Sequence, residues 1–359
     1  ARREDPSVGV VRAAGPYARV NTETAEIGTV RQVESPSGVV QSGGFGLLLT
    51  QGDGRAWEID PAAPQDVREQ TGAQTDLAAS PTADSAAALE GEEPGGATAS
   101  AAAVIRAPGG TQQVIAAGDA VLFHTESGAT YLGAIGANRA NSANSAAGSA
   151  RSLDELTLLD PFAAEDAGSG TEQPEFRADA AAIDANGLVA LFSQDEHAVR
   201  WFDASTGEFR RTVSEVPEEV PAEGIQLAII GDDWVLFDAA NGRLWREGAP
   251  AVSLDVAGTP LLQGSSTQGP ALVADDLGLW SVDGTVAERV TTAGGVPARP
   301  EQVGGEMVAA WIAASSAALW TGSAGESALE FDGSGDTGAG PAPGIRGNGA
   351  RALVTDMRP

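Results

Sequence analysis

A hairpin that returns along the chain is the feature that most limits its fold. Each copy has a short apolar run, a polar turn and a second run that carries Trp or Tyr and closes on Asp. The clear copies are Gly46–Asp60, Leu188–Asp203, Ile225–Asp238 and Ala271–Asp283, and looser ones are Ala120–Leu132 and Met307–Asp332. Short runs rich in Val, Leu, Ile and aromatic residues, separated by Gly, Asp or Ser, are typical of antiparallel strands joined by tight turns. The copies predict an all-β repeat protein.

The spacing of the copies indicates which repeat architecture they build. Asp203, Asp238 and Asp283 are 35 and 45 residues apart. Three or four strands in roughly 35 to 50 residues are the size of a β-propeller blade. A single blade cannot bury both of its faces, so blades stack on their neighbours to complete the core. We therefore predict one β-propeller domain over residues 1–359.

Six internal blades and one shared blade follow from the strand pattern. The internal candidates are residues 39–70, 111–159, 179–213, 225–254, 261–290 and 299–332. The strands Tyr17–Asn21 and Ile27–Val33 lack the outer half of a blade, and Arg351–Thr355 lacks a partner. Joining the two chain ends in one blade would close the ring and remove exposed edges. This favours seven blades, with six and eight as alternatives.

Two segments interrupt the repeat. Residues 71–108 are rich in Ala, Ser, Glu and Gly, and residues 137–152 are rich in Ala, Asn and Ser. Neither can bury enough apolar surface to order itself. We expect both to be low-complexity loop insertions at blade edges.

The charge of the chain limits its partners. The formal net charge is −29 and the pI is about 4.2. Such an acidic surface repels nucleic acid and anionic lipid headgroups, and leaves proteins, glycans or further copies of the chain as partners. The sequence has no stretch of about 18 apolar residues, so this segment predicts no insertion into a membrane.

Catalytic machinery is not visible in the sequence. Cys is absent and all 21 basic residues are Arg, which excludes Cys and Lys nucleophiles and disulfides. His124 is expected in a strand and His197 in a turn of another blade, so neither predicts a zinc site. The single Asp336-Thr337-Gly338 lacks the second loop that an aspartic protease needs. We predict no catalytic, cofactor-binding or metal-binding residue, and no cofactor.

Acidic side chains offer two alternatives to that prediction. Asp332, Ser334 and Asp336 have the alternating oxygen ligands that open a Ca²⁺ loop, but no Glu follows at EF-hand spacing, which favours a plain turn. The closing residues Asp60, Asp203, Asp238 and Asp283 could line a metal channel. Asp before a turn usually accepts backbone N–H bonds, so we expect that role for them.

A set of tryptophans recurs at one position of the repeat. Its members are Trp57, Trp201, Trp245, Trp280 and Trp320. Aromatic rings can form a platform for stacking glycans, but their recurrence in successive repeats favours packing between blades.

Two stretches resemble known families. Residues 203–210 (DASTGEFR) and 238–245 (DAANGRLW) look like blade motifs of quinoprotein-type propellers. Residues 19–23, 41–43 and 57–60 resemble the extracytoplasmic, propeller-like region of large actinobacterial cell-surface proteins that carry fibronectin type III or other Ig-like domains. The second resemblance implies a location on or outside the cell surface, with a membrane anchor upstream of Ala1. It brings no catalytic residues.

The hypothesis that these observations favour is a non-catalytic, cell-surface or secreted propeller. It would bind protein or glycan partners, or assemble with its own subunits. The alternatives are a quinoprotein-like or Ca²⁺-assisted enzyme and the sensor domain of a signalling protein.

Overall fold

The structure is a computed structural model of the chain. It describes residues 6–10, 16–21, 26–32, 36–42, 45–50, 54–59, 104–135, 156–162, 176–313, 316–330, 344–348 and 351–355. No helix in this part of the chain has the length and apolar character needed to span a bilayer.

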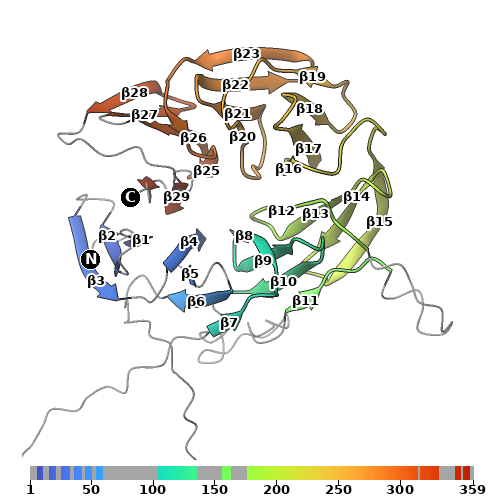
Figure 1. Cartoon of the computed structure of the whole chain (residues 1–359), viewed down its shortest axis with the longest axis horizontal. Coiled ribbons are helices and arrows are strands. Elements are labelled where there is room, and N and C mark those ends of the chain that lie inside the picture. The colour runs from blue at the N-terminus through green and yellow to red at the C-terminus, as the bar shows by residue number, and fades with distance from the viewer. Residues whose placement is uncertain are drawn as a thin grey trace, which may run out of the picture.

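Six sheets of four or five antiparallel strands follow one another around a ring and form the blades of a β-propeller (Figure 1). The first blade contains β4 (Pro36–Ser42), β5 (Phe45–Thr50), β6 (Arg55–Ile59) and β7 (Val104–Arg106). The second contains β8 (Thr111–Ala117), β9 (Ala120–Thr125), β10 (Thr130–Ala134) and β11 (Thr157–Leu158). The third contains β12 (Ala180–Ile183), β13 (Leu188–Ser193), β14 (Ala198–Asp203) and β15 (Glu208–Glu215).

The remaining three blades repeat this order of strands. The fourth contains β16 (Ile225–Ile230), β17 (Asp233–Asp238), β18 (Arg243–Arg246) and β19 (Val252–Ser253). The fifth contains β20 (Leu261–Leu262), β21 (Ala271–Asp275), β22 (Gly278–Asp283) and β23 (Val286–Thr291). The sixth contains β24 (Val296–Pro297), β25 (Glu301–Val303), β26 (Glu306–Ile312), β27 (Ser316–Thr321) and β28 (Gly325–Glu330), with β24 and β25 both paired to β26.

The two chain ends lie between the sixth and first blades but do not share one hydrogen-bonded sheet. β1 (Pro6–Val10), β2 (Pro16–Asn21) and β3 (Glu26–Gln32) form one sheet, and β29 (Gly344–Asn348) and β30 (Arg351–Thr355) form another. β29 lies against β25, β4 and β1, so strands from both ends meet where the ring closes.

The predicted all-β propeller is confirmed, and the blade count is corrected. The structure has six blades, which was an alternative, rather than the favoured seven. The expected shared blade is replaced by two terminal sheets within the described residues: β1, β2 and β3 pair with one another, and β30 has β29 as its partner. That partner, Gly344–Asn348, carries little apolar pattern by which the sequence could reveal it.

The two predicted insertions fall mostly outside the described residues. Residues 71–103 and 137–152 belong to that part of the chain. The end of the first segment differs from the prediction, because Val104–Arg106 is β7 and pairs with β6 as the outer strand of the first blade. In this pair Val104 lies opposite Trp57, so a long connection joins the third and fourth strands of the first blade.

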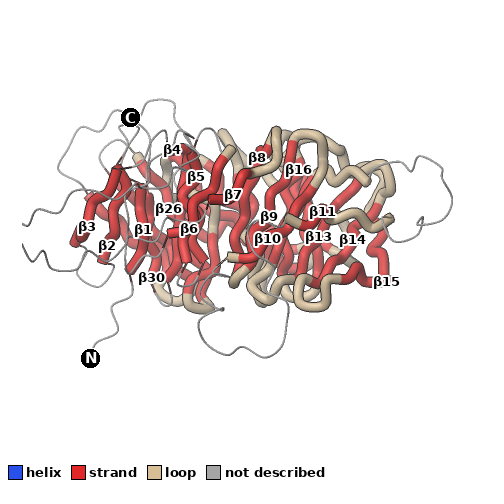
Figure 2. The backbone as a smooth tube through the Cα atoms, turned by 90° about the horizontal axis from the view of Figure 1, so that it is seen from below, coloured by secondary structure: helices blue, strands red, loops and turns tan. Residues whose placement is uncertain are grey.

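Strands run across the thickness of the ring, and connecting loops gather on its two faces (Figure 2). In Figure 1 the first strand of each blade lies nearest the centre and the last lies at the rim. Each blade therefore has an inner edge near the centre of the ring and an outer edge at the rim.

Apolar side chains from neighbouring blades pack together along each of five seams. The second strands are buried almost throughout, as in β9, β13 and β21. At roughly 25 cal/mol per Å² of buried apolar surface, such seams supply most of the free energy that stabilises a repeat fold. Buried members of successive seams are Leu47 with Phe123, Leu122 with Leu191, Trp201 with Trp245, Phe237 with Val273, and Leu272 with Trp311.

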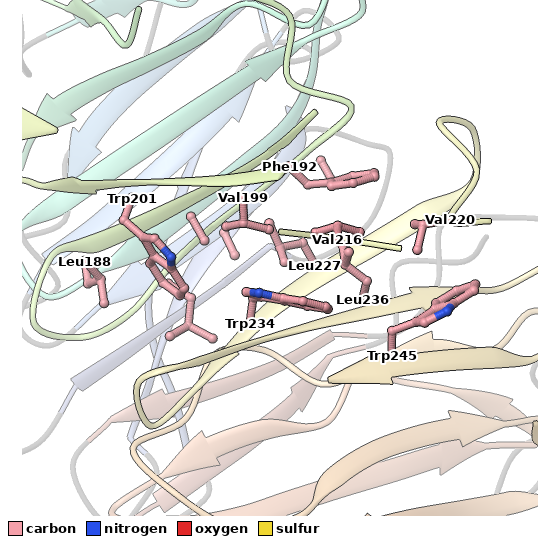
Figure 3. Close-up of a cluster of buried hydrophobic side chains, with 14 residues drawn as sticks. Leu188, Phe192, Val199, Trp201, Val216, Val220, Leu227, Trp234, Leu236 and Trp245 are labelled. Carbon is pink, nitrogen blue, oxygen red and sulfur yellow. The ribbon is translucent and has the colours of Figure 1, made fainter. Parts of the chain in front are cut away.

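The seam between the third and fourth blades contains three tryptophans (Figure 3). Trp201 comes from β14, and Trp234 and Trp245 come from β17 and β18. Their exposed fractions are 4%, 3% and 2%. Phe192 and Leu236 pack in the same cluster, so side chains of both blades fill one continuous core.

We predict that replacing Trp245 with Ala lowers the free energy of unfolding by about 3–5 kcal/mol, because it removes a large side chain from this seam. Val286→Ala is the matched control, since Val286 is 65% exposed on β23; its effect should stay within about 0.5 kcal/mol. Urea denaturation followed by circular dichroism measures both. Equal losses for the two variants would contradict the assigned seam.

Candidate functional site

Polar side chains join the inner strands of the fourth, fifth and sixth blades. Gln226 on β16 donates from Nε2 to the carbonyl oxygen of Pro260 at 2.9 Å and accepts from the Leu262 amide at 2.7 Å. One amide side chain thereby satisfies both a backbone acceptor and a backbone donor of the next blade. The contact fixes β20 beside β16.

A turn of the fifth blade docks on the fourth blade by main-chain bonds. The Ser266 amide donates to the Ile229 carbonyl, and the Gly231 amide donates to the Ser266 carbonyl. Gln263 is fully buried and supports this turn, donating to Ser266 Oγ at 2.9 Å and accepting from the Leu272 amide at 2.8 Å. The buried amide is therefore satisfied at both of its ends.

The sixth blade contacts the fifth through Arg299 and Gln302. Arg299 lies between β24 and β25, and its Nε and Nη2 donate to the carbonyl oxygens of Leu262 and Gln263, both at 3.1 Å. Gln302 donates to Thr267 Oγ1 and accepts from the Thr267 amide, also at 3.1 Å. We call the set that joins these three blades the inner polar seam: Gln226, Gln263, Ser266, Thr267, Arg299 and Gln302.

The inner polar seam is a structural link and supplies no reacting group. Its described side chains are amides, hydroxyls and one guanidinium, and they bond mainly to backbone groups of the neighbouring blade. Sequence analysis missed it. The bonded partners are 34 to 37 residues apart in the chain, which is about the length of one blade. This separation is the feature of the sequence that could have indicated the contacts.

The closing aspartates bind the backbone of the turns that follow them, as predicted, wherever the structure gives them a partner. Asp203 accepts from the Ser205 amide and hydroxyl, at 2.9 and 2.6 Å. Asp238 accepts from the amides of Ala240 and Asn241 and from Asn241 Nδ2. Asp283 is exposed and Asp60 lies outside the described residues.

These aspartates do not occupy equivalent positions in the blades. Asp203 and Asp283 end the third strands β14 and β22, whereas Asp238 ends the second strand β17. The copy Ile225–Asp238 consists of the first and second strands of its blade, whereas the copy Leu188–Asp203 consists of the second and third. The sequence analysis therefore matched two hairpins that differ by one strand. A hairpin has the same local pattern whichever two adjacent strands of a blade form it, so that pattern does not show which strands of the blade are present.

Two further aspartates have the same structural role and were not singled out by sequence. Asp184 accepts from the amides of Asn186 and Leu188. Asp275 is fully buried and pairs through both carboxylate oxygens with Arg289, each at 3.0 Å. The Arg289 guanidinium also lies 4.5 Å from the ring centre of Trp280. This buried charge is thus paired and covered within the fifth blade.

The predicted tryptophan set occupies one strand of the blade. Trp57, Trp201, Trp245, Trp280 and Trp320 all lie on third strands: β6, β14, β18, β22 and β27. Trp201 and Trp245 belong to the third seam, Trp280 packs on the fourth and Trp320 on the fifth. Packing between blades, the favoured alternative, describes this arrangement for those four residues.

The two histidines belong to neighbouring blades and have different surroundings. His124 is buried in β9 and its Nδ1 lies 3.0 Å from Thr130 Oγ1. Burial lowers the pKa of the His124 imidazole below 6.5. His197 occupies the predicted turn, with a φ of 51° in the left-handed region. Within the described residues, no group of three or more His, Asp or Glu side chains could hold a metal ion.

Two carboxyl groups have shifted pKa values for different reasons. The hydrogen bond from the Ser205 hydroxyl lowers the pKa of Asp203. Burial raises the pKa of Asp179, which accepts from the Gln194 amide. The candidate Ca²⁺ loop Asp332, Ser334 and Asp336 and the segment Asp336-Thr337-Gly338 lie outside the described residues.

The outer strand of the third blade is the longest of the six outer strands described. β15 has eight residues, β23 and β28 have six each, and β7, β11 and β19 have three, two and two. Arg210, Arg211, Thr212 and Val213 are all exposed. Arg210 and Arg211 belong to none of the ion pairs formed among the described residues.

Comparison with known proteins gives similarity of fold alone. No protein-family model matches the chain, and no curated protein matches it. BamB from Moraxella catarrhalis is 11% identical, with a TM-score of 0.47 over 96% of this chain and 89% of that one. A catalytically inactive virginiamycin B lyase from Staphylococcus aureus with quinupristin is 11% identical, with a TM-score of 0.48 over 89% and 91%. Hsv2 from Kluyveromyces lactis is 7% identical, with a TM-score of 0.46 over 89% and 87%.

We predict that Asp238→Asn lowers the free energy of unfolding by about 1–3 kcal/mol, because a charged acceptor of three hydrogen bonds becomes neutral. Thermal melts test whether Asp238 instead binds Ca²⁺. The wild type should have the same melting temperature in EDTA and in about 1 mM CaCl₂, a concentration at which Ca²⁺ sites of extracellular modules bind the ion. Stabilisation of the wild type by Ca²⁺ that Asp238→Asn abolishes would contradict the structural role.

Acidification should destabilise the fold through His124. Because the folded state lowers the pKa of this imidazole, the neutral form is favoured, and stability is lost as the pH falls from 6.5 toward the lowered pKa. His124→Gln keeps a partner for Thr130 and should flatten this decline, as measured by urea denaturation between pH 7 and 5. His197→Asn is the control, since Asn tolerates a positive φ and His124 is still present. An equally steep decline in His124→Gln would contradict the assignment.

Proposed function

We propose that this chain is a non-catalytic binding module that presents a rigid propeller to a partner outside the cytoplasm. The partner is a protein or a glycan, and the long open edge of β15 favours a protein. Backbone groups on an unpaired strand edge bond readily to another polypeptide chain.

The use of the acidic side chains is the observation that carries the proposal. Acid–base or metal chemistry would need carboxylates that converge on a shared point. Here Asp184, Asp203, Asp238 and Asp275 direct their oxygens to turn amides or to Arg289 in their own blades. Their hydrogen bonds hold the frame of the ring, which suits a scaffold whose surfaces do the binding.

The proposed location on the cell surface or in the secreted fraction rests on the sequence. Residues 19–60 supply it through their resemblance to extracytoplasmic regions of actinobacterial surface proteins. A strongly acidic surface, at net charge −29, also keeps a secreted chain soluble and away from anionic lipid.

Affinity capture from the surface fraction of the native host tests the proposed function. Biotinylated wild-type chain should enrich a reproducible set of partner proteins over an unrelated acidic protein of matched charge. The same set should bind Asp203→Asn and Asp238→Asn variants at temperatures below their melting points, and should bind in EDTA. No enrichment over the acidic control, or turnover of a surface component that requires one of these aspartates, would contradict the proposal.

A further inference from the structure

We propose that the outer edge of β15 docks an extended segment of a partner protein that carries two adjacent acidic residues. The segment adds as a further strand to the third blade, with its two carboxylates opposite Arg210 and Arg211. This inference rests on the proposed function and identifies the surface and the chemistry of the partner.

The edge has the length and the free hydrogen-bonding groups that strand addition requires. β15 ends its sheet, in the order β12–β13–β14–β15. Outside its pairing with β14, no backbone–backbone bond of the described chain involves residues 208–213. The eight residues of β15 lie against the six residues Ala198–Asp203 of β14, a length of about 20 Å at roughly 3.3 Å per residue, which is enough for a short peptide.

The centre of this edge carries two positive charges in a strongly acidic molecule, with the exposed Glu208 and Glu215 at its two ends. The chain has 50 acidic and 21 basic residues, yet two arginines stand side by side here, and both are exposed. Arg200, Arg243 and Arg289 each form an ion pair with a carboxylate. Among the described residues Arg210 forms no such ion pair, but after the Ser205 hydrogen bond its charge helps to lower the pKa of Asp203. A guanidinium binds a carboxylate through two parallel hydrogen bonds, so adjacent arginines select adjacent acidic side chains.

A bulge in β15 interrupts its regular pairing with β14 at the two arginines. Phe209 lies opposite Phe202 and Val213 opposite Arg200, so Trp201 alone faces the three residues 210–212. Bulges and charges on an edge are general protection against indiscriminate pairing of strands. Here they leave an acidic strand as the partner that this edge can accept.

The same charges disfavour a second copy of the edge. In a centred antiparallel pair of two β15 strands, Glu208 would face Glu215 at both ends. Like charges directly opposite each other destabilise strand pairing. The edge therefore fits a different segment, one that is acidic in its centre and uncharged at its flanks.

Apolar groups on either side of the arginines complete the expected motif. Phe209 is half-buried against Phe202, with ring centres 5.0 Å apart, and Val213 is 36% exposed. Residues directly opposite in antiparallel strands share a face of the sheet. The partner segment should therefore read apolar, any residue, acidic, acidic, apolar, opposite Val213 through Phe209.

Fluorescence anisotropy of a labelled peptide, acetyl-Thr-Val-Thr-Glu-Glu-Val-Thr-amide, tests the inference on the full chain. The wild type should bind it saturably, and R210E/R211E should weaken binding at least tenfold. R106E is the matched control, because Arg106 is also exposed on an outer strand, β7, and has no adjacent arginine; it should change binding less than twofold. Circular dichroism and melting temperatures establish that all three proteins are folded.

Changes to the peptide distinguish strand addition from simple charge attraction without altering the protein. A Lys-Lys centre should abolish binding, and N-methylation of alternate peptide amides should weaken it at least tenfold, because it removes the donors of the ladder. Undiminished binding of the methylated peptide, or of the Glu-Glu peptide to R210E/R211E, would overturn the inference. So would self-association of the wild type that R210E/R211E abolishes, because it would assign the edge to a second copy.

Affinity capture with R210E/R211E separates this inference from the proposed function. Loss of the partners that wild type captures supports the edge as their site. Capture at the wild-type level overturns the assignment of the edge while the proposed function stands. Failure of the wild type itself to capture any partner is the failure of the proposed function.

Discussion

Burial of apolar side chains between neighbouring blades is the interaction on which the rest of this structure depends. A four-stranded sheet has two faces, and in a ring each is covered by the next sheet. Trp201 and Trp245 meet in one such seam, and Trp311 and Leu272 in another. Because the seams hold the blades, polar groups need only fix their angle and register. Gln226, Arg299 and Gln302 do so at the inner edges.

Local chemistry made the blades predictable. Five of the six predicted internal units match their blades to within three residues at each end, and the first, residues 39–70, misses the outer strand β7 at Val104–Arg106. Turn signals such as Asn241-Gly242 explain this, since Gly242 adopts the positive φ that its turn requires. The tryptophans were predictive because a large aromatic side chain on the third strand packs in the third, fourth and fifth seams.

Features set by ring closure could not be read from the sequence. Gly344–Asn348 has no apolar alternation, and its place as β29 depends on the neighbours β25, β4 and β1. Asp238 was aligned with Asp203 because both follow a hairpin, although the strands differ. Gln263 looked like an ordinary polar loop residue, and only the docking of its turn on the fourth blade buries it. For β29 and for the turn of Gln263, the deciding partner is about a blade or more away in the chain.

The outer edges of the blades are the strands of this fold that a partner protein can reach. A seam is covered on both sides and the inner polar seam is saturated, so a partner meets chiefly loops and rim strands. β15 is the longest of the described outer strands, and it carries two adjacent exposed arginines in a molecule of net charge −29.

Native-state hydrogen exchange of the whole chain tests the central claim, that the seams join the blades into one cooperative unit. The claim predicts that the amides of the buried second strands β9, β13, β17, β21 and β26 exchange through one common opening, with the same free energy and the same dependence on denaturant. Separate opening free energies for individual blades would contradict it.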